Sequence, residues 1–266
     1  MWLNHVTQVD VPVGRFWMDL CAGRDQVAMQ VHQKGWASYE APLPFLLASW
    51  CERLSPMVVD VGANTGFYSL LAAVSGAQRV IAVEPVQEIS EVLAANVRLS
   101  ELGECVQLLR VALGEQVGEQ VLHFPLTTHG LLETSASLNP HFRTQHSQQR
   151  VVPVETLDMV LADQWYLAKH VPLLIKMDVE SFELTVLAGG AQVLERWRPA
   201  VVAEILPGAD VLAWQQFMQC WGYVHCALKP NAPYVSDATM VIDLNMLVRD
   251  HLFLPQEAVM RWLPAV

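Results

Sequence analysis

The chain has 266 residues, 53% of them hydrophobic, and a formal net charge of −11. This length predicts one domain with an elaborated N-terminus, large enough to fold without disulfides or a structural metal. The negative charge argues against binding to nucleic acid or to an anionic membrane surface, since both need clustered Lys and Arg. No apolar run is long enough to cross a bilayer. Five cysteines and an N-terminus without a signal-peptide pattern predict a cytoplasmic protein with reduced thiols, and the high apolar content also suits a homodimer.

The first fifty residues are predicted to form a cap ahead of the main domain, which we assign to residues 51–266. Within the cap, Trp17, Met18 and Leu20 are typical of a strand edge. Residues 40–50 are predicted to be helical, because proline near the start of a helix is tolerated.

From residue 57 onward, predicted strands and helices alternate. The predicted strands cover residues 57–61, 80–84, 106–112, 120–124, 173–177, 200–205, 223–227 and 239–245. The predicted helices cover residues 67–74, 89–100, 182–197 and 208–222, with a further helix between residues 158 and 166. Such alternation is typical of a doubly wound, mostly parallel α/β sheet that binds ligands at the carboxyl ends of its strands.

A polar interruption at residues 125–150 breaks this pattern. A connection of this length in an α/β domain is usually a functional loop or lid, although a solvated insertion has the same composition. His129, His141 and His146 lie in it, and each is either a candidate base or an exposed loop histidine. The sequence leaves both alternatives open.

The strand at residues 57–61 ends in an acidic residue and is followed by Gly62 and Gly66 and then by an apolar helix. A strand, a glycine turn and a helix in this order predict a site for a nucleotide-like cofactor. Glu84 ends the next strand, where a carboxylate accepts hydrogen bonds from ribose hydroxyls. This glutamate does not distinguish a dinucleotide from S-adenosylmethionine, because both contain ribose.

The glycine spacing separates these two cofactors. A dinucleotide fingerprint places glycines at offsets zero, two and five, where this chain has Gly62, Asn64 and Phe67. Asp60 also brings a negative charge that suits a sulfonium or ammonium group and opposes a pyrophosphate. We therefore favour S-adenosylmethionine over NAD.

Acidic residues lie near the carboxyl ends of four of the predicted strands, namely Asp60, Glu84, Asp178 and Glu204. If the chain stays extended after residue 177, Lys176, Asp178 and Glu180 face the same side. Methyl transfer depends on positioning, and an alcohol acceptor also needs a base, which a carboxylate can supply. The alternative is that Lys176 and Asp178 form a structural ion pair.

Two metal sites are conceivable from the sequence. Cys220, His225 and Cys226 lack a second ligand pair at zinc-finger spacing, so buried thiols are the simpler interpretation. Asp178, Glu180 and Glu204 could hold magnesium, but nothing in the sequence requires it. We predict no metal.

Four segments, at residues 59–66, 83–85, 111–114 and 175–184, resemble the FkbM-type methyltransferases in the right order. The resemblance covers about residues 55–206. It implies a class I methyltransferase (Rossmann-like) sheet, taken here as seven-stranded, with a final antiparallel strand. It also implies S-adenosylmethionine as cofactor, with methylation of hydroxyls on sugars or polyketide-type natural products.

The resemblance implies roles for single residues. Asp60, Gly62, Asn64 and Gly66 would contact the methionine part of the cofactor, Glu84 the ribose, and Ala112 and Leu113 the adenine. The full set of candidate cofactor contacts is Glu40, Asp60, Gly62, Asn64, Gly66, Phe67, Tyr68, Glu84, Pro85, Ala112, Leu113 and Asp178. The candidate catalytic residues are Asp178, Glu180, Lys176 and Glu204, of which Asp178 and Glu180 would face the acceptor.

One departure from the family motif concerns Ser181 and Phe182, which replace Gly and Ala. The bulk of Phe182 is expected to change the acceptor pocket more than cofactor binding. Three other functions remain open: methylation of a peptide side chain, an NAD-dependent oxidoreductase, and a non-catalytic protein that kept the fold.

Overall fold

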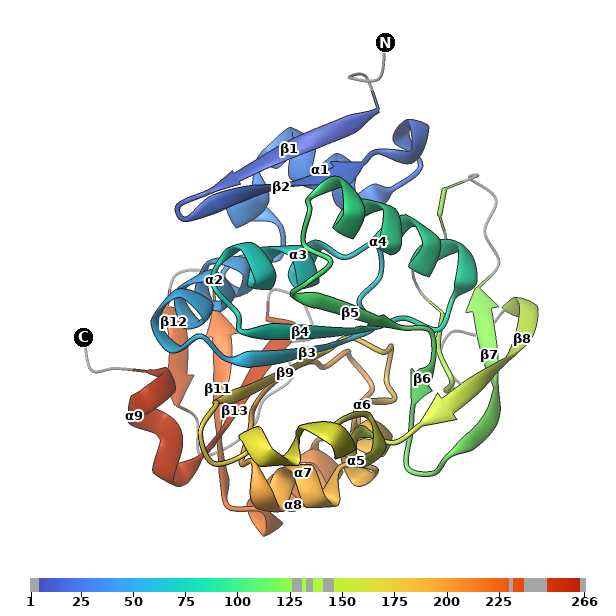
Figure 1. Ribbon diagram of the computed structural model, residues 1–266. Helices are drawn as coiled ribbons and strands as arrows, with labels where there is room; N and C mark the ends of the chain where they lie inside the picture. The colour runs from blue at the N-terminus through green and yellow to red at the C-terminus, as the bar shows by residue number, and fades with distance from the viewer. Residues whose placement is uncertain are drawn as a thin grey trace.

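The computed structural model describes residues 5–125, 131–132, 136–140, 146–229, 232–236 and 248–263. Within these residues the centre of the fold is an eight-stranded sheet (Figure 1). From one edge to the other, its strands are β12 (Ala232–Ser236), β11 (Tyr223–Lys229), β13 (Asp250–Pro255), β10 (Ala200–Glu204), β9 (Leu173–Met177), β3 (Met57–Val61), β4 (Arg79–Val83) and β5 (Val106–Leu109).

The five strands from β10 to β5 run parallel, and β13 is antiparallel to both of its neighbours. The predicted doubly wound, class I type of sheet with a final antiparallel strand is therefore confirmed. The predicted number of seven strands is wrong for the described chain, because β12 adds an eighth strand antiparallel to β11. The predicted strand at residues 239–245 lies outside the described residues.

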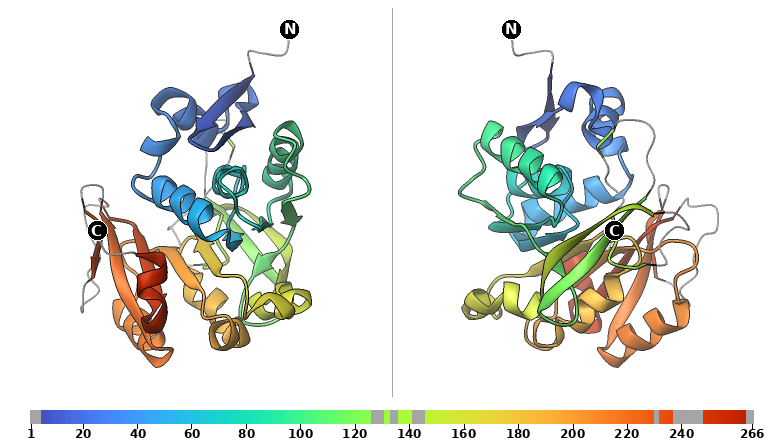
Figure 2. Two further views of the ribbon diagram at one scale, coloured as in Figure 1. Left: turned by 60° about the vertical axis from the view of Figure 1, so that its left-hand side comes forward. Right: turned by 90° about the vertical axis from the view of Figure 1, so that its right-hand side faces the viewer.

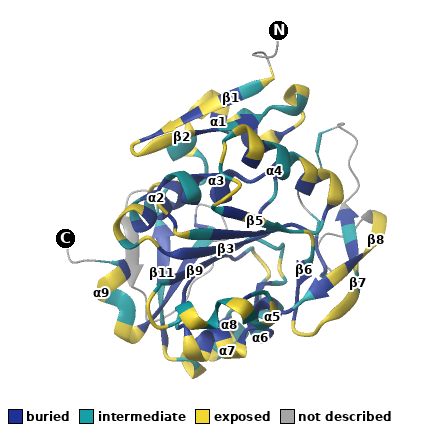
Figure 3. Ribbon diagram, viewed as in Figure 1, coloured by how far each residue is buried: buried dark blue, intermediate teal, exposed yellow. Residues whose placement is uncertain are grey.

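Helices cover both faces of the sheet (Figures 1 and 2). One face carries α2 (Leu43–Leu54), α3 (Phe67–Val74) and α4 (Gln87–Leu99), and the other carries α5 (Leu157–Val160), α6 (Glu183–Ala188), α7 (Ala191–Arg196) and α8 (Val211–Cys220). Every residue of β3, β9 and β10 is buried, as Figure 3 shows for the centre of the sheet. A separate hydrophobic cluster fills each face, which explains why these strands are apolar apart from Asp60, Lys176 and Glu204.

The N-terminal residues form the hairpin β1 (Val6–Val11) and β2 (Gly14–Asp19), followed by α1 (Gln26–Lys34). This hairpin lies over α3 and α4 as an outer layer (Figure 2). The backbone N–H of Trp17 donates to Ser100 Oγ at 2.9 Å, and that of Asp19 donates to Asn96 Oδ1 at 2.8 Å. Phe16 and Met18 are fully buried in the same core cluster as α3. The assignment of residues 1–50 as a separate cap stays a prediction.

A three-stranded sheet of β6 (Ala112–Leu113), β8 (His146–Glu155) and β7 (Gly118–Pro125) lies beside the main sheet. The predicted single strand at residues 106–112 is therefore wrong. β5 ends at Leu109, and Ala112 and Leu113 pair with β8. An apolar run shows that a segment is buried, but it does not show where the chain leaves one sheet for another.

The predicted helix at residues 182–197 is two helices, α6 and α7, which are separated by Gly189 and Gly190. A Cβ on Gly189 would overlap the backbone carbonyl of Gly114, so this site requires close backbone packing. Between residues 158 and 166, α5 is followed by a 3-10 helix at Ala162–Leu167. The chain ends its described part with α9 (Val259–Trp262). None of the helices in the described ranges is long and apolar enough to cross a bilayer.

Candidate active site

The turn after β3 brings two loops together at the carboxyl edge of the sheet. Gly62 has a φ of +75°, and its N–H and that of Ala63 both donate to the carbonyl of Val83 at 3.0 Å. A Cβ on Gly62 would overlap the carbonyl oxygen of Asp178. Glycine is thus required both for the backbone conformation and for the approach of the loop that follows β9.

Glu84 directly follows β4 and lies beside this turn. Its two carboxylate oxygens accept hydrogen bonds from the N–H groups of Asn64, at 3.0 Å, and Val86, at 2.9 Å. Burial raises the pKa of Glu84 to about 7, although these two hydrogen bonds oppose the shift. Each oxygen keeps one lone pair for a ligand hydroxyl.

These loops enclose a pocket of about 670 Å³, measured with its open mouth. Eight of the residues predicted from the sequence line it, namely Gly62, Asn64, Glu84, Pro85, Ala112, Leu113, Asp178 and Glu180. The rest of the pocket wall is apolar and was not predicted from the sequence. It includes Val86, Ile89, Leu122, Ala136, Leu138 and Phe182, of which Phe182 is expected from the sequence to affect the acceptor pocket. These residues come from separate elements of the chain, so no single sequence motif identifies them.

The other predicted cofactor contacts lie behind the pocket wall. Asp60 is buried on the α3 side of β3, where its Oδ2 accepts a hydrogen bond from Ser69 at 2.6 Å. Gly66 is the N-cap of α3, with a φ of +101°. Phe67 packs edge-on against the ring of Tyr39, at 5.0 Å between centroids.

Tyr68 and Glu40 form a pair in the same region. The Tyr68 hydroxyl donates to Glu40 Oε2 at 2.8 Å. Neither residue lines the pocket. Burial, followed by the charge of Asp178, raises the pKa of Glu40. The pair joins the segment before α2 to the first turn of α3, next to the charged groups at the strand ends.

Lys176 lies inside the protein, only 4% exposed, with Nζ 3.6 Å from Asp178 Oδ2 and 4.0 Å from Asp60 Oδ1. The sheet register explains the Asp60 contact, because Asp60 of β3 is opposite Lys176 of β9. Burial lowers the pKa of Lys176, but the nearby carboxylates of Asp178, Asp60 and Glu40 more than compensate and raise it above its usual value. The structural ion pair weighed from the sequence is therefore present.

Glu204 ends β10 next to Asp178. Burial and the neighbouring Asp178 carboxyl raise the pKa of Glu204 to about 10. Arg249 Nη1 lies 2.9 Å from Glu204 Oε1, and Arg249 Nη2 lies 3.6 Å from Glu40 Oε1. Asp178 and Glu204 thus form a carboxyl pair that is flanked by Lys176 on one side and Arg249 on the other.

Arg249 and Asp250 were missed from the sequence. Asp250 begins β13 opposite Glu204, so the antiparallel pairing brings it to the acidic strand ends. Burial and the charge of Glu40 raise the pKa of Asp250 to about 8. A correct assignment of the strand at Asp250–Pro255 would have identified both residues.

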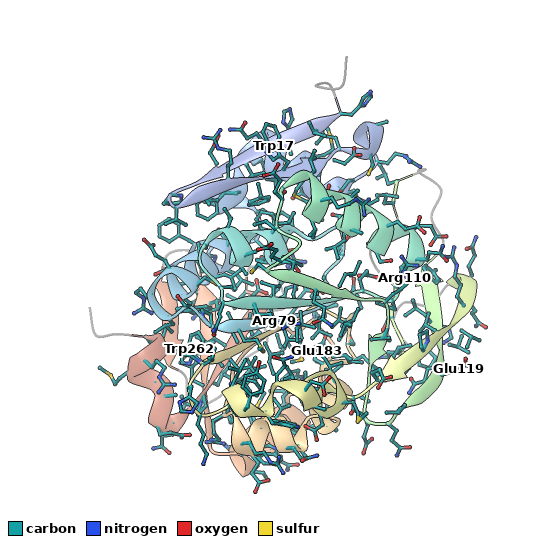
Figure 4. All side chains as sticks on the ribbon, viewed as in Figure 1. Trp17, Arg79, Arg110, Glu119, Glu183 and Trp262 are labelled. Carbon is teal, nitrogen blue, oxygen red and sulfur yellow. The ribbon has the colours of Figure 1, made fainter. Side chains whose placement is uncertain are left out.

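The chain does not stay extended after β9, so the condition set for a row of Lys176, Asp178 and Glu180 is not met, although Asp178 and Glu180 both line the pocket. Glu180 and Ser181 have φ values of +55° and +70°, which turn the chain sharply. Glu183 Oε1 accepts from the N–H groups of Val179 and Ser181, both at 3.2 Å. This buried glutamate is the first residue of α6, and it is labelled in Figure 4.

Part of the polar loop reaches the pocket. Ala136 and Leu138 line it, and Ser137 Oγ donates to the carbonyl of Glu180 at 2.7 Å. His129 and His141 lie outside the described residues, and His146 begins β8. No group of three or more His, Cys, Asp or Glu in the described chain is arranged to hold a metal.

A second hollow, of about 1070 Å³ with its open mouth, lies between the loops that follow β9 and β10. Its wall combines apolar and polar groups from both loops and from α8, including Asn139, Ser181, Leu184, Leu206, Pro207 and Trp214. Ser181 follows Glu180 of the first pocket, and Leu206 lies two residues beyond Glu204. The carboxyl pair is therefore close in the chain to both hollows.

Comparisons with known proteins point to methyltransferases. A model of the methyltransferase FkbM domain matches residues 60–224, which is more than half of the chain. No curated protein sequence matches the chain.

Similar solved structures have low sequence identity to the chain. An FkbM methyltransferase from Methylobacillus flagellatus is 16% identical, with a TM-score of 0.48, over 74% of this chain and 43% of that one. A SAM-dependent methyltransferase from Agrobacterium tumefaciens is 11% identical, with a TM-score of 0.46, over 96% of this chain and 72% of that one. A precorrin-6y C5,15-methyltransferase from Geobacter metallireducens is 11% identical, with a TM-score of 0.41, over 80% and 86%. The chain thus spans less than half the length of the first of these proteins.

Proposed function

The chain belongs to the FkbM methyltransferase family, and we propose that it transfers a methyl group from S-adenosylmethionine to a hydroxyl of a small natural product or sugar. The observation that carries this proposal is the carboxyl pair of Asp178 and Glu204 at the ends of the adjacent strands β9 and β10, where Asp178 lines the pocket. A donor bound in the pocket would then lie next to a group that can take up a proton.

The pocket suits an adenosyl group with a cationic tail. Gly62 of the glycine turn lines the pocket, and Glu84 offers acceptors to a ribose diol. Asp178 adds a carboxyl group on the same wall. A carboxylate at this position favours a ligand with a sulfonium and an ammonium group.

When bound, the cofactor supplies an electrophilic methyl group. Glu84 and the turn at Gly62 would hold its adenosyl part, so that the methyl group would pass to the acceptor oxygen and the neutral thioether would be the leaving group. The carboxyl pair of Asp178 and Glu204 accepts the hydroxyl proton during the reaction. Lys176 and Arg249 keep the pair in place from either side.

We assign the acceptor to the hollow lined by Ser181, Leu184, Leu206 and Trp214. Its apolar and polar wall fits a hydroxylated organic molecule better than a highly charged one. Its position supports this assignment, since in open α/β sheets ligands bind outside the carboxyl ends of the strands.

The experiment is a two-stage assay on the full chain. Isothermal titration calorimetry with S-adenosylmethionine, S-adenosylhomocysteine and NAD should show binding of the first two alone. Incubation with labelled S-adenosylmethionine and a panel of hydroxylated metabolites, sugars and peptides should then transfer label to a hydroxyl. Folded protein that binds NAD instead would overturn the proposal, and label on peptide side chains would replace its acceptor.

A further inference from the structure

Phe182 is a bulky residue at a position where the resembled family motif has alanine, and its ring lines the cofactor pocket. The side chain is half-buried and packs against two hydrophobic clusters. One lies between the main sheet and the helices α5 to α8, and the other includes residues of the small three-stranded sheet. A Cβ on Gly114 would lie 3.7 Å from its ring. Phe182 therefore fills the space between the loop after β9 and the small sheet.

The pocket has one polar and one apolar region. Gly62, Asn64 and Asp178 bring backbone groups and a carboxylate, whereas Leu122 and Leu138 extend the apolar wall around Phe182. Glu84 fixes the ribose in our proposed function. A purine attached to that ribose gains most from the apolar region, where its faces contact aliphatic and aromatic groups.

Hydrogen bonds on both sides hold this apolar region in place. The carbonyl of Phe182 accepts from the N–H groups of Thr185, at 3.1 Å, and Val186, at 3.2 Å, at the start of α6. Ser137, next to Leu138, donates from Oγ to Glu180 and pairs its backbone with His123 at 2.8 and 3.1 Å. These bonds fix the backbone on which the side chains of the apolar wall stand.

We propose that Phe182 is a specificity-determining residue, which sets the size of the adenine region and excludes cofactors with a bulky group on the base. The inference rests on the proposed function, because it concerns the same pocket. It predicts that a smaller side chain at this position admits base-substituted cofactors.

The test measures cofactor selectivity by calorimetry. The ligands are S-adenosylhomocysteine and two derivatives of it, one benzylated at N6 and one with a phenyl group at C2. We expect the wild type to bind the unsubstituted ligand at least 100-fold more tightly than either derivative. In Phe182→Ala this ratio should fall at least tenfold for one derivative, and in Phe182→Leu it should fall by less.

Phe124→Ala is the matched control. Phe124 belongs to the same small-sheet cluster, but it does not line the pocket. Its truncation should leave the selectivity ratio unchanged. An equal fall of the ratio in Phe124→Ala would overturn the proposal, because general loosening would then explain the effect.

The failures of the two proposals differ. Wild-type protein that binds no S-adenosylhomocysteine rejects the proposed function. Wild-type protein that binds it, with an unchanged ratio in both Phe182 variants, rejects this inference alone. If thermal unfolding shows that Phe182→Ala does not fold, Phe182→Leu decides the question.

Discussion

Glu204 stands at the end of β10 with Arg249 on one side and Asp178 on the other. Glu204→Gln keeps the shape of the side chain and an oxygen for Arg249, but it removes the titratable group. We expect kcat to fall about 10² to 10⁴-fold, the range for loss of proton transfer, with the cofactor Kd changed only slightly. Steady-state kinetics and calorimetry on the variant measure both quantities.

Glu257→Gln is the matched control for this change. Glu257 pairs with Arg198 through contacts of 2.8 and 3.1 Å and lies far from the pocket in the fold. Its substitution should leave kcat intact. An equal loss in both variants would show that Glu204 acts through the fold and not through the acceptor proton.

Ser181 adopts a φ of +70° where the resembled motif has glycine. A side chain in this left-handed region costs about 1 kcal/mol, so Ser181→Gly should raise the free energy of unfolding by about that amount. Chemical denaturation measures the change. Ser38→Gly serves as control, since Ser38 lacks a positive φ and its replacement should lower stability. No gain in Ser181→Gly would mean that the loop carries no backbone strain.

At the scale of elements, the break between α6 and α7 depends on close packing. Gly189→Ala places a methyl group against the backbone carbonyl of Gly114, which cannot move as a flexible side chain can. We expect a loss of stability of about 2 kcal/mol. Gly103→Ala is the control, because a Cβ there meets nothing within 4 Å and its φ is not positive. Equal unfolding midpoints for the two variants would contradict this account of the break.

The loop after β10 carries the second prediction at this scale. Leu206→Trp should reduce the volume of the hollow that we assign to the acceptor. The expected result is a KM for the acceptor raised about tenfold, since one misfitting side chain is worth about 1–3 kcal/mol, with the Kd for S-adenosylhomocysteine unchanged. A weakened Kd together with an unchanged KM would move the acceptor elsewhere.

At the scale of the whole molecule, the buried carboxyl groups make stability depend on pH. Burial raises the pKa of Glu84 and Glu183 to about 7, of Asp250 to about 8 and of Glu204 to about 10. In the unfolded chain these carboxyl groups lose their protons near pH 4, whereas in the folded chain they keep them up to the raised pKa values. Between pH 4 and those pKa values the folded state binds more protons than the unfolded state, so the free energy of unfolding should fall as pH rises.

Urea unfolding from pH 5 to pH 9 checks this slope, which can reach about 1.4 kcal/mol per pH unit for each group that titrates. Glu84→Gln should make the slope shallower from pH 5 to pH 7, because one of the retained protons is lost. A stability that rises over this range would contradict the arrangement of the cluster.

Much of the fold and of the cofactor pocket could be predicted from the sequence. Gly62, Glu84 and Asp178 stand at strand ends, and the parallel order of an α/β sheet brings such ends to one edge whatever the details of packing. The patterns that mark these strand ends lie within short stretches of the chain, so they can be recognised in one sequence. The positions of β3, β9 and α3 follow from the same apolar patterns.

The tertiary structure decided what depends on contacts between distant segments. Arg249 reaches Glu204 because β13 is inserted between β10 and β11, and Asp60 turns to Ser69 and Lys176 because β3 is buried on both faces. Phe182 joins the pocket wall because two left-handed residues redirect the chain before it. Each of these placements depends on how distant segments pack against each other, and no residue spacing in the sequence indicates it.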